Sequence, residues 1–288
     1  MILQQLNVLN NLTNAFPPRR TAVPDPGSQE TPLTGFFTDT TVCIGCKACE
    51  VACKQWNQLP SDGFHFTGNS YDNTKMLSAT TWRHVAFKEQ MGDEKKGESN
   101  RWLMMSDVCK HCEDAPCQQS CPTGAIIYNE FGNVYVQNDI CNGCGYCVAA
   151  CPFGVLGRSR EDGHAHKCTL CYDRQKGGET PACAKACPTA SIQFGPVEEL
   201  RERARQRVED LHARGRTDAY LYGAKPMGEY SALSSFFLLE DHPHEYNLPE
   251  APPQPFRDMN KRYAASLLTG LALTVVSALF FRGGSHAR

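Results

Sequence analysis

Cysteine dominates the chemistry that this sequence could perform. The 288-residue chain contains sixteen cysteines, which fall into four groups of four with none left over. Four thiolates are what one [4Fe–4S] cluster requires, so the count predicts four such clusters. The groups, in chain order, are Cys43, Cys46, Cys49 and Cys53; Cys109, Cys112, Cys117 and Cys121; Cys141, Cys144, Cys147 and Cys151; and Cys168, Cys171, Cys183 and Cys187.

The spacing of the cysteines argues against the other common uses of thiols. Groups one and three both run C-x2-C-x2-C-x3-C, which is the cluster-binding run of bacterial ferredoxins. Structural zinc sites typically use two CxxC pairs with a longer gap between them. Disulfide scaffolds are usually short secreted chains, and their cysteines are not locked into this repeat. We therefore interpret the cysteines as iron ligands.

The fourth cysteine of each group has a separate role in this interpretation. Three closely spaced cysteines wrap three corners of a cube, and in two-cluster ferredoxins the fourth ligates the other cube. Gly45, Gly143 and Gly145 would let the backbone approach the clusters. The predicted ligand sets are Cys43, Cys46, Cys49 and Cys187 for cluster 1; Cys109, Cys112, Cys117 and Cys151 for cluster 2; Cys141, Cys144, Cys147 and Cys121 for cluster 3; and Cys168, Cys171, Cys183 and Cys53 for cluster 4.

This pairing predicts an α+β fold of two nested ferredoxin-like modules, each holding two clusters, with long loops. The outer module would comprise residues 36–100 and 160–196, and the inner module residues 101–159. Between groups two and three, β-prone runs at 125–128 and 134–136 predict a hairpin. The cysteine-free stretch in the first half of the outer module would supply loops and strands that cover a cluster or face a partner.

Three further segments flank the modules. Residues 1–35 are rich in Asn, Pro and Thr and predict an N-terminal arm; they lack the long apolar core of a secretory signal. Residues 197–262 predict a helix followed by an irregular extension, because apolar residues recur at helical spacing only as far as Leu211. Residues 191–194 predict a short strand before that helix.

Residues 263–282 predict a transmembrane helix in contact with membrane lipid. Ala264 to Phe281 is a run of eighteen residues without a charge, bracketed by Lys261, Arg262 and Arg282. The alternative is a buried helix of a soluble core, but the terminal position and the basic flanks argue against it. Small residues along the run favour packing against other membrane helices. They are Ser266, Thr269, Gly270, Thr274 and Ser277.

No second constellation competes with the cysteines. The chain has no GxGxxG followed by an acidic residue, no P-loop and no nucleophile triad. Its formal charge of −2 gives no indication of nucleic acid binding. We therefore expect an electron conduit with no catalytic site of its own, working as a subunit of an oxidoreductase complex. Lysines beside the ligands would offset part of the cluster charge; they are Lys47, Lys54, Lys110, Lys167 and Lys185.

Four stretches carry a family resemblance. The sequences CIGCKAC at 43–49, CKQWN at 53–57, KCTLCYDR at 167–174 and PAC at 181–183 resemble the iron–sulfur β subunit of membrane-bound respiratory formate dehydrogenases, within the molybdopterin oxidoreductase superfamily. The resemblance covers most of residues 38–281 and includes the terminal helix. It implies a catalytic α subunit with a molybdenum or tungsten pterin and its own Fe–S cluster, and a cytochrome b-type membrane γ subunit that reduces quinone in anaerobic respiration.

The resemblance also implies a route and a location. Electrons would enter at cluster 1, pass clusters 4 and 2, and leave from cluster 3 toward haem. Related nitrate and dimethyl sulfoxide reductase subunits commonly have Trp where this chain has Cys144, so four full cubes favour the formate branch. The chain would be a single-pass protein of the cell membrane, with its cluster domain on the periplasmic face and its C-terminus in the cytoplasm.

Two other functions remain open at this point. One is the electron-transfer subunit of another molybdopterin reductase, of the nitrate, dimethyl sulfoxide or polysulfide type, with electrons running the opposite way. The other is a stand-alone membrane-anchored polyferredoxin that serves diffusible partners.

Overall fold

The structure is a computed structural model. It divides into a cysteine-bearing unit that ends at Gln254 and a C-terminal unit that begins at Pro255. Most of the expected N-terminal arm, up to residue 31, lies outside the described residues. The described residues are 32–63, 68, 71–72, 74–92, 100–228, 230–256 and 259–283.

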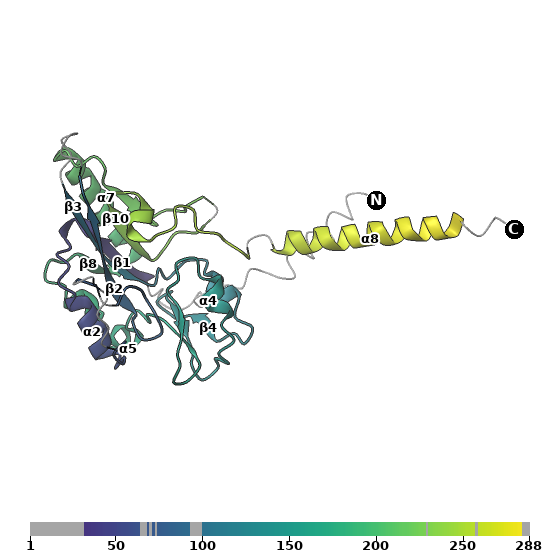
Figure 1. Cartoon of the computed structure of the whole chain (residues 1–288), viewed down its shortest axis with the longest axis horizontal. Helices are drawn as coiled ribbons and strands as arrows, with labels where there is room; N and C mark the ends of the chain where they lie inside the picture. The colour runs from purple at the N-terminus through teal and green to yellow at the C-terminus, as the bar shows by residue number, and fades with distance from the viewer. Residues whose placement is uncertain are drawn as a thin grey trace. The chain divides into compact units, whose positions relative to one another are not determined.

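A four-stranded sheet forms the centre of the cysteine-bearing unit (Figure 1). Its strand order is β8 (Ile192–Pro196), β1 (Thr34–Asp39), β10 (Ser235–Leu239) and β9 (Tyr220–Tyr222). Strands β1 and β10 pair in parallel, and the two outer pairings are antiparallel. Both central strands are buried almost throughout, so their apolar runs have protein on both faces.

The two faces of the sheet border different cores because side chains alternate along a strand. Phe37 and Phe236 stack at 5.5 Å between ring centroids and pack with Leu200 of helix α7 (Val197–Ala213). Phe36 and Phe237 face the other way, into the core that contains buried cysteines. The sheet therefore separates a purely apolar helix–sheet layer from the layer that holds the thiols.

Three antiparallel hairpins and five short helices build the cysteine layer. The hairpins are β2 (Arg83–Gln90) with β3 (Arg101–Val108), β4 (Ile126–Tyr128) with β5 (Val134–Val136), and β6 (Gly157–Arg158) with β7 (Ala165–His166). The helices are α2 (Ala48–Trp56), α3 (Pro116–Gln119), α4 (Tyr146–Ala150), α5 (Tyr172–Lys176) and α6 (Ala182–Lys185). Two 3₁₀ turns, η1 (Thr40–Val42) and η3 (Pro243–Tyr246), complete the unit.

The mixed α and β content agrees with the sequence-based prediction, as do the hairpin β4–β5, strand β8 and helix α7. The segment 216–256 differs from the expected irregular extension, because it contains β9 and the central strand β10. β10 forms there because a short continuous apolar run suits a strand buried on both faces. Strand β8 pairs with β1 in the central sheet.

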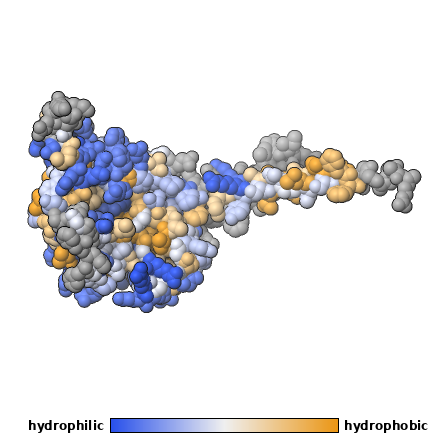
Figure 2. All heavy atoms as spheres, viewed as in Figure 1, coloured by the Kyte–Doolittle hydropathy of each residue, from blue (hydrophilic) through white to orange (hydrophobic). Residues whose placement is uncertain are grey.

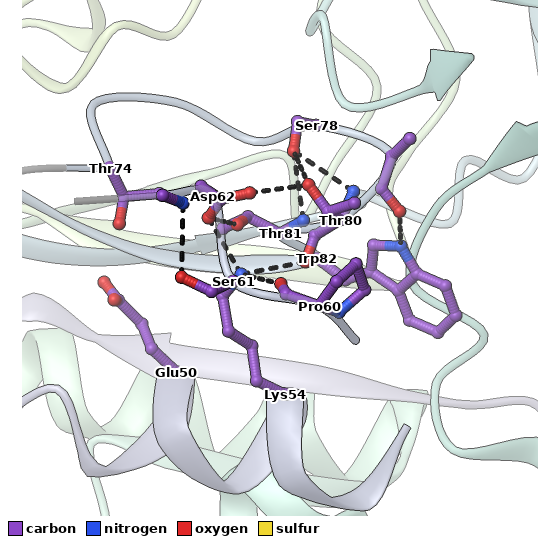
Figure 3. Close-up of polar contacts among 12 residues, drawn as sticks. Glu50, Lys54, Pro60, Ser61, Asp62, Thr74, Ser78, Thr80, Thr81 and Trp82 are labelled. Carbon is purple, nitrogen blue, oxygen red and sulfur yellow. Dashed lines mark hydrogen bonds and ion pairs between the residues drawn. The ribbon is translucent and has the colours of Figure 1, made fainter. Parts of the chain in front are cut away.

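Lys54 follows the last cysteine of its group, where the other three groups have proline, and its side chain holds the next loop in place. Its Nζ donates to Asp62 Oδ2 at 2.8 Å and to the carbonyl oxygens of Pro60 and Thr80 at 3.0 and 3.1 Å. Asp62 also accepts from the hydroxyls of Thr80 and Thr81 (Figure 3). Helix α2 thereby anchors both ends of the loop between itself and β2.

The C-terminal unit contains helix α8 (Met259–Gly283). Its segment Lys261–Phe281 is 21 residues long and apolar enough to cross a membrane. Hydrophobic residues gather along the helix (Figure 2), and Leu267, Leu271 and Phe280 are all more than 60% exposed. The hydroxyls of Thr269 and Thr274 bond to carbonyl oxygens of their own helix, which satisfies these groups without water. The helix is thus consistent with the predicted membrane anchor.

Candidate iron–sulfur site

One small cavity brings together cysteines from the two ends of the cysteine-bearing sequence. Val85, Ser106 and Ile192 close it on the protein side. The loop before α2 supplies Cys43 and Cys46, the first turn of α2 supplies Cys49, and the segment after α6 supplies the fourth cysteine. These cysteines are Cys43, Cys46, Cys49 and Cys187.

Two further cavities have the same construction. One cavity lies between α3, β5 and the segment after α4, with Phe153 and Tyr230 in its wall. The other lies between the loop before α4 and the start of β4. The first is lined by Cys109, Cys112, Cys117 and Cys151. The second is lined by Cys121, Cys141, Cys144 and Cys147.

The remaining four cysteines gather where α2 packs against α6. Negative charge on Cys168, Cys183 and Cys171 would raise the pKa of Cys53, after the larger effect of burial, so these thiols are electrostatic neighbours. In each of the four sets, three cysteines belong to one sequence group and the fourth is the last cysteine of another. The structure therefore brings together the residues of each predicted ligand set.

A shared backbone feature shapes the four cysteine loops. The residue immediately before the second cysteine of each group has a positive φ: 65° at Gly45, 43° at His111, 68° at Gly143 and 55° at Leu170. Only glycine adopts this conformation without steric cost, so His111 and Leu170 hold it against a penalty of about 1 kcal/mol. Sequence reasoning recognised the glycines alone; the signal for the other two was their identical place in the CxxC motif.

Two of these glycines are also required by their surroundings. A Cβ at Gly45 would lie 2.6 Å from the Met104 sulfur, and a Cβ at Gly143 would lie 2.3 Å from the carbonyl oxygen of Gly163. Neither neighbour leaves room for a side chain. Glycine at these two positions therefore lets the first and third cysteine loops pack closely against neighbouring residues.

Burial controls the acid–base behaviour of most thiols. It raises the pKa of Cys49 to about 11, against the opposing charge of Arg83, and that of Cys168 to about 12. Burial together with the neighbouring Cys121 raises the pKa of Cys147 to about 11. Cys121 differs: burial also raises its pKa, but hydrogen bonds led by that from Thr123 outweigh this effect and lower it. Free buried thiols therefore keep their protons at neutral pH, and iron binding must displace them.

Besides residues next to the cysteines in sequence, such as Thr123, three polar side chains from distant parts of the chain contact cysteine sulfurs directly. Tyr230 O–H donates to Cys112 Sγ at 3.2 Å, and Arg83 Nη2 donates to Cys183 Sγ at 3.3 Å. Ser106 Oγ lies 3.2 Å from Cys49 Sγ. Sequence reasoning missed all three residues, because each lies far along the chain from the cysteine that it touches.

The expected lysines fall into two classes. Lys110 and Lys167 are almost fully buried: Lys110 pairs with Asp107, and Lys167 donates to the carbonyl oxygens of Val134 and Cys168. Lys47 and Lys54 are instead partly exposed and form ion pairs with Glu50 and Asp62, and Lys185 is exposed. Two of the five lysines thus place a buried positive charge among the thiols.

The residues present fit [4Fe–4S] clusters. Three sets offer four thiols around one cavity, the thiols of the fourth set are electrostatic neighbours, and thiolates are the ligands that such clusters use. Among the described residues, no three His, Cys, Asp or Glu side chains are placed to hold a single metal ion. The walls are otherwise apolar or hydrogen-bond donors to sulfur, which suits an anionic cluster.

Family comparisons define the class of protein first. Two models of the 4Fe-4S dicluster domain match this chain, one at residues 42–125 and the other at residues 100–197. Together with the sixteen cysteines they establish an iron–sulfur electron-transfer protein that binds four [4Fe–4S] clusters.

The relatives then define the family. The chain is 40% identical to the formate dehydrogenase iron–sulfur subunit of Haemophilus influenzae over 248 residues, which cover 83% of this chain and 77% of that one. It is 46% identical to the nitrate-inducible formate dehydrogenase iron–sulfur subunit of Escherichia coli K12 over 191 residues, covering 66% of this chain and 63% of that subunit. It is 35% identical to one chain of the anaerobic dimethyl sulfoxide reductase of Escherichia coli K12 over 174 residues, covering 59% and 76%.

The protein belongs to the family of formate dehydrogenase iron–sulfur subunits. It spans 63% of the length of the Escherichia coli nitrate-inducible subunit that it matches. The names of these relatives describe subunits and chains of larger enzymes.

Proposed function

We propose that this chain conducts electrons from a formate-oxidising catalytic subunit with a molybdenum or tungsten pterin to a cytochrome b-type membrane subunit that reduces quinone. The observation that supports the proposal most is the construction of the four cysteine sets, each completed by a cysteine from a different sequence group. The names of the relatives with 40–46% identity supply the substrate. Each bound cluster supplies a centre that accepts one electron and passes it on.

The proposed ligands are the four sets that the structure brings together. The set that contains Cys43 would hold cluster 1, and the set that contains Cys109 would hold cluster 2. The set that contains Cys141 would hold cluster 3, and the set that contains Cys168 would hold cluster 4. Apolar side chains around each set exclude water and lower the local dielectric constant. Sharing of last cysteines between groups one and four, and between groups two and three, would make the outer and inner modules two nested units.

The proposed order of electron transfer, from cluster 1 through clusters 4 and 2 to cluster 3, is supported by the electrostatic proximity of sets 1 and 4 and of sets 4 and 2. Cys49 and Cys183 lie on packed helices, and a charge on Cys183 would raise the pKa of Cys49, which links sets 1 and 4. A charge on Cys109 would raise the pKa of Cys168, after burial, which links sets 4 and 2. Cys46 and Cys144 are the two solvent-exposed cysteines, and they belong to sets 1 and 3, the proposed points of entry and exit.

A substitution series on the purified membrane complex tests the ligand sets. This chain should contribute about sixteen iron atoms to the wild-type complex, in addition to those of the catalytic subunit's own cluster and of haem. Replacing Cys53 or Cys171 with Ser should remove the same electron paramagnetic resonance signal, and replacing Cys46 with Ser should remove a different one. Loss of one common signal in the Cys46 and Cys53 variants would contradict the shared ligation.

A kinetic experiment tests the direction and the substrate. Formate added to the anaerobic complex should reduce all four clusters and then a quinone analogue, whereas the Cys144→Ser variant should still accept electrons but pass them to quinone more slowly. Reduction by quinol followed by oxidation with dimethyl sulfoxide or nitrate, without any response to formate, would identify a reductase subunit instead.

The proposed location follows from helix α8. This helix would cross the cell membrane once, packed against the cytochrome subunit, with the cysteine-bearing unit in the periplasm. Protease added to intact spheroplasts should then cut the cysteine-bearing unit and leave a tag placed after Arg288 intact. Cleavage of the tag alone would indicate the opposite orientation, with the cysteine-bearing unit in the cytoplasm.

A further inference from the structure

Arg83 is the first residue of β2, and its side chain is buried between two of the cysteine sets. Only 1% of the residue is exposed to solvent. Its Nη2 donates to Cys183 Sγ at 3.3 Å, and its Nη1 donates to both oxygens of Ser106 at 3.3 Å. The guanidinium carbon lies 4.7 Å from the centroid of the Phe36 ring. One cation is therefore enclosed between a strand, an aromatic ring and a cysteine.

Ser106 extends this contact to the other set. Its Oγ accepts from Arg83 Nη1 and lies 3.2 Å from Cys49 Sγ. A continuous polar connection thus runs from the sulfur of Cys183 through Arg83 and Ser106 to the sulfur of Cys49. These two cysteines belong to the proposed ligand sets of clusters 4 and 1.

In the described part of the chain, the guanidinium of Arg83 has no carboxylate as an ion-pair partner. Among the described residues, no aspartate or glutamate forms an ion pair with it, whereas buried Lys110 has Asp107 and buried Lys167 faces two carbonyl oxygens. Enclosing an unpaired cation in protein costs several kcal/mol. Neutral thiols cannot offset that cost, but two anionic clusters with their thiolates can.

We propose that Arg83 is the shared counter-cation of clusters 1 and 4, and that it raises both of their reduction potentials. The proposal rests on the proposed function, because it requires both clusters. Adding an electron makes each cluster more negative, so a fixed positive charge beside it stabilises the reduced state more than the oxidised state. Ser106 adds a hydrogen bond on the cluster 1 side alone.

Four variants of the complete complex separate these contributions. Arg83→Gln removes the charge, Arg83→Lys keeps it with fewer donors, and Ser106→Ala removes only the link to Cys49. Arg101→Gln is the matched control, because Arg101 lies at the other end of the same hairpin and bonds to Asp241 and the Glu240 carbonyl. The readout is a redox titration followed by electron paramagnetic resonance, with iron and sulfide analysis of each preparation.

In Arg83→Gln, two of the four midpoint potentials should fall, each by at least the equivalent of a tenfold change in the reduced-to-oxidised ratio, which is about 59 mV for one electron. Ser106→Ala should lower only one of those two, and Arg101→Gln none. Arg83→Lys should shift the same two potentials by less than Arg83→Gln.

Unchanged potentials in Arg83→Gln, an equal shift of all four, or equal shifts for Gln and Lys would overturn the role of Arg83. If the Arg83→Gln complex does not assemble, the Arg83→Lys and Ser106→Ala complexes provide the test. The one potential that Ser106→Ala lowers must be among the two that Arg83→Lys shifts, and any other result contradicts the connection through Arg83 and Ser106. Fewer than four clusters in this chain of the wild-type complex would instead refute the proposed function. Failure of the Arg83 proposal and failure of the proposed function are therefore distinguishable.

Discussion

The ion pair between Arg207 and Asp39 should control the local stability of the turn that leads into Cys43. Arg207 Nε donates to Asp39 Oδ2 at 2.9 Å, and its Nη2 donates to Thr41 Oγ1 at 3.1 Å. Asp39 Oδ1 accepts from the backbone N–H of Thr41 at 2.9 Å, which caps η1. The Asp39 side chain is only 4% exposed and that of Arg207 is 25% exposed.

This difference in exposure predicts different costs for removing each partner. Arg207→Gln leaves a buried carboxylate without its cation, which costs about 3 kcal/mol, at the lower end for buried pairs because water reaches the arginine side. Asp39→Asn keeps an oxygen for the cap and leaves a cation that water can solvate, so about 1 kcal/mol is expected. A free-energy change of about 1.4 kcal/mol changes an equilibrium tenfold, so the cost of Arg207→Gln corresponds to roughly 100-fold more frequent local unfolding of this turn.

Hydrogen–deuterium exchange of the intact complex measures that opening. Amides in the peptide 36–46 should exchange roughly 100-fold faster in Arg207→Gln, about fivefold faster in Asp39→Asn, and unchanged in the hairpin β4–β5. Arg205→Gln is the control, because Arg205 pairs with Glu202 on the surface. The reasoning is refuted if Arg207→Gln and Arg205→Gln behave alike, or if Asp39→Asn has the larger effect.

Three more outcomes follow from contacts described above. Lys54→Met should free the loop held by Asp62, so that limited proteolysis cuts residues 57–82 several times faster; the surface variant Lys88→Met, which loses an exposed pair with Glu245, should match wild type. Tyr230→Phe removes the donor to Cys112 Sγ. If the lost hydrogen bond contributes about 1.5 kcal/mol, the midpoint potential of one cluster should fall by about 60 mV. Unchanged potentials of all four clusters would contradict this prediction. Anaerobic removal of iron with a chelator should make the cysteine-bearing unit sensitive to protease, because seven cysteines belong to its main core; equal resistance with and without iron would show that the core forms without the clusters.

Local patterns predicted the parts of this protein that depend on neighbouring residues. The repeat C-x2-C identified the thiols, helical periodicity identified α7 from Leu200 and Leu211, and uninterrupted hydropathy identified α8. The hairpin β4–β5 followed from two β-prone runs separated by a short turn. Each of these signals lies within about twenty residues, which is the range over which sequence periodicity is informative.

The features that sequence reasoning missed depend on distant contacts. β10 is short, and its parallel partner β1 precedes it by nearly the whole unit, so no hairpin signal marks it. Arg83 looks like an ordinary surface residue of a strand until the fold encloses it. The positive φ of Leu170 likewise follows from the shape of the cysteine loop, against the intrinsic preference of leucine.

The pairing of β1 with β10 determines when the cysteine-bearing unit can close during synthesis. The hydroxyl of Thr40 donates to the carbonyl oxygen of Leu238, 198 positions further along the sequence. At about 5–20 residues per second, a ribosome needs roughly 10–40 s to extend the polypeptide from the first cysteine group to β10. Throughout that interval Phe36 and Phe37 lack their central partner strand, and the first thiols stand open to iron delivery and to oxidation alike. Biogenesis of this subunit therefore depends on protection of a nascent polypeptide as much as on the stability of the finished fold.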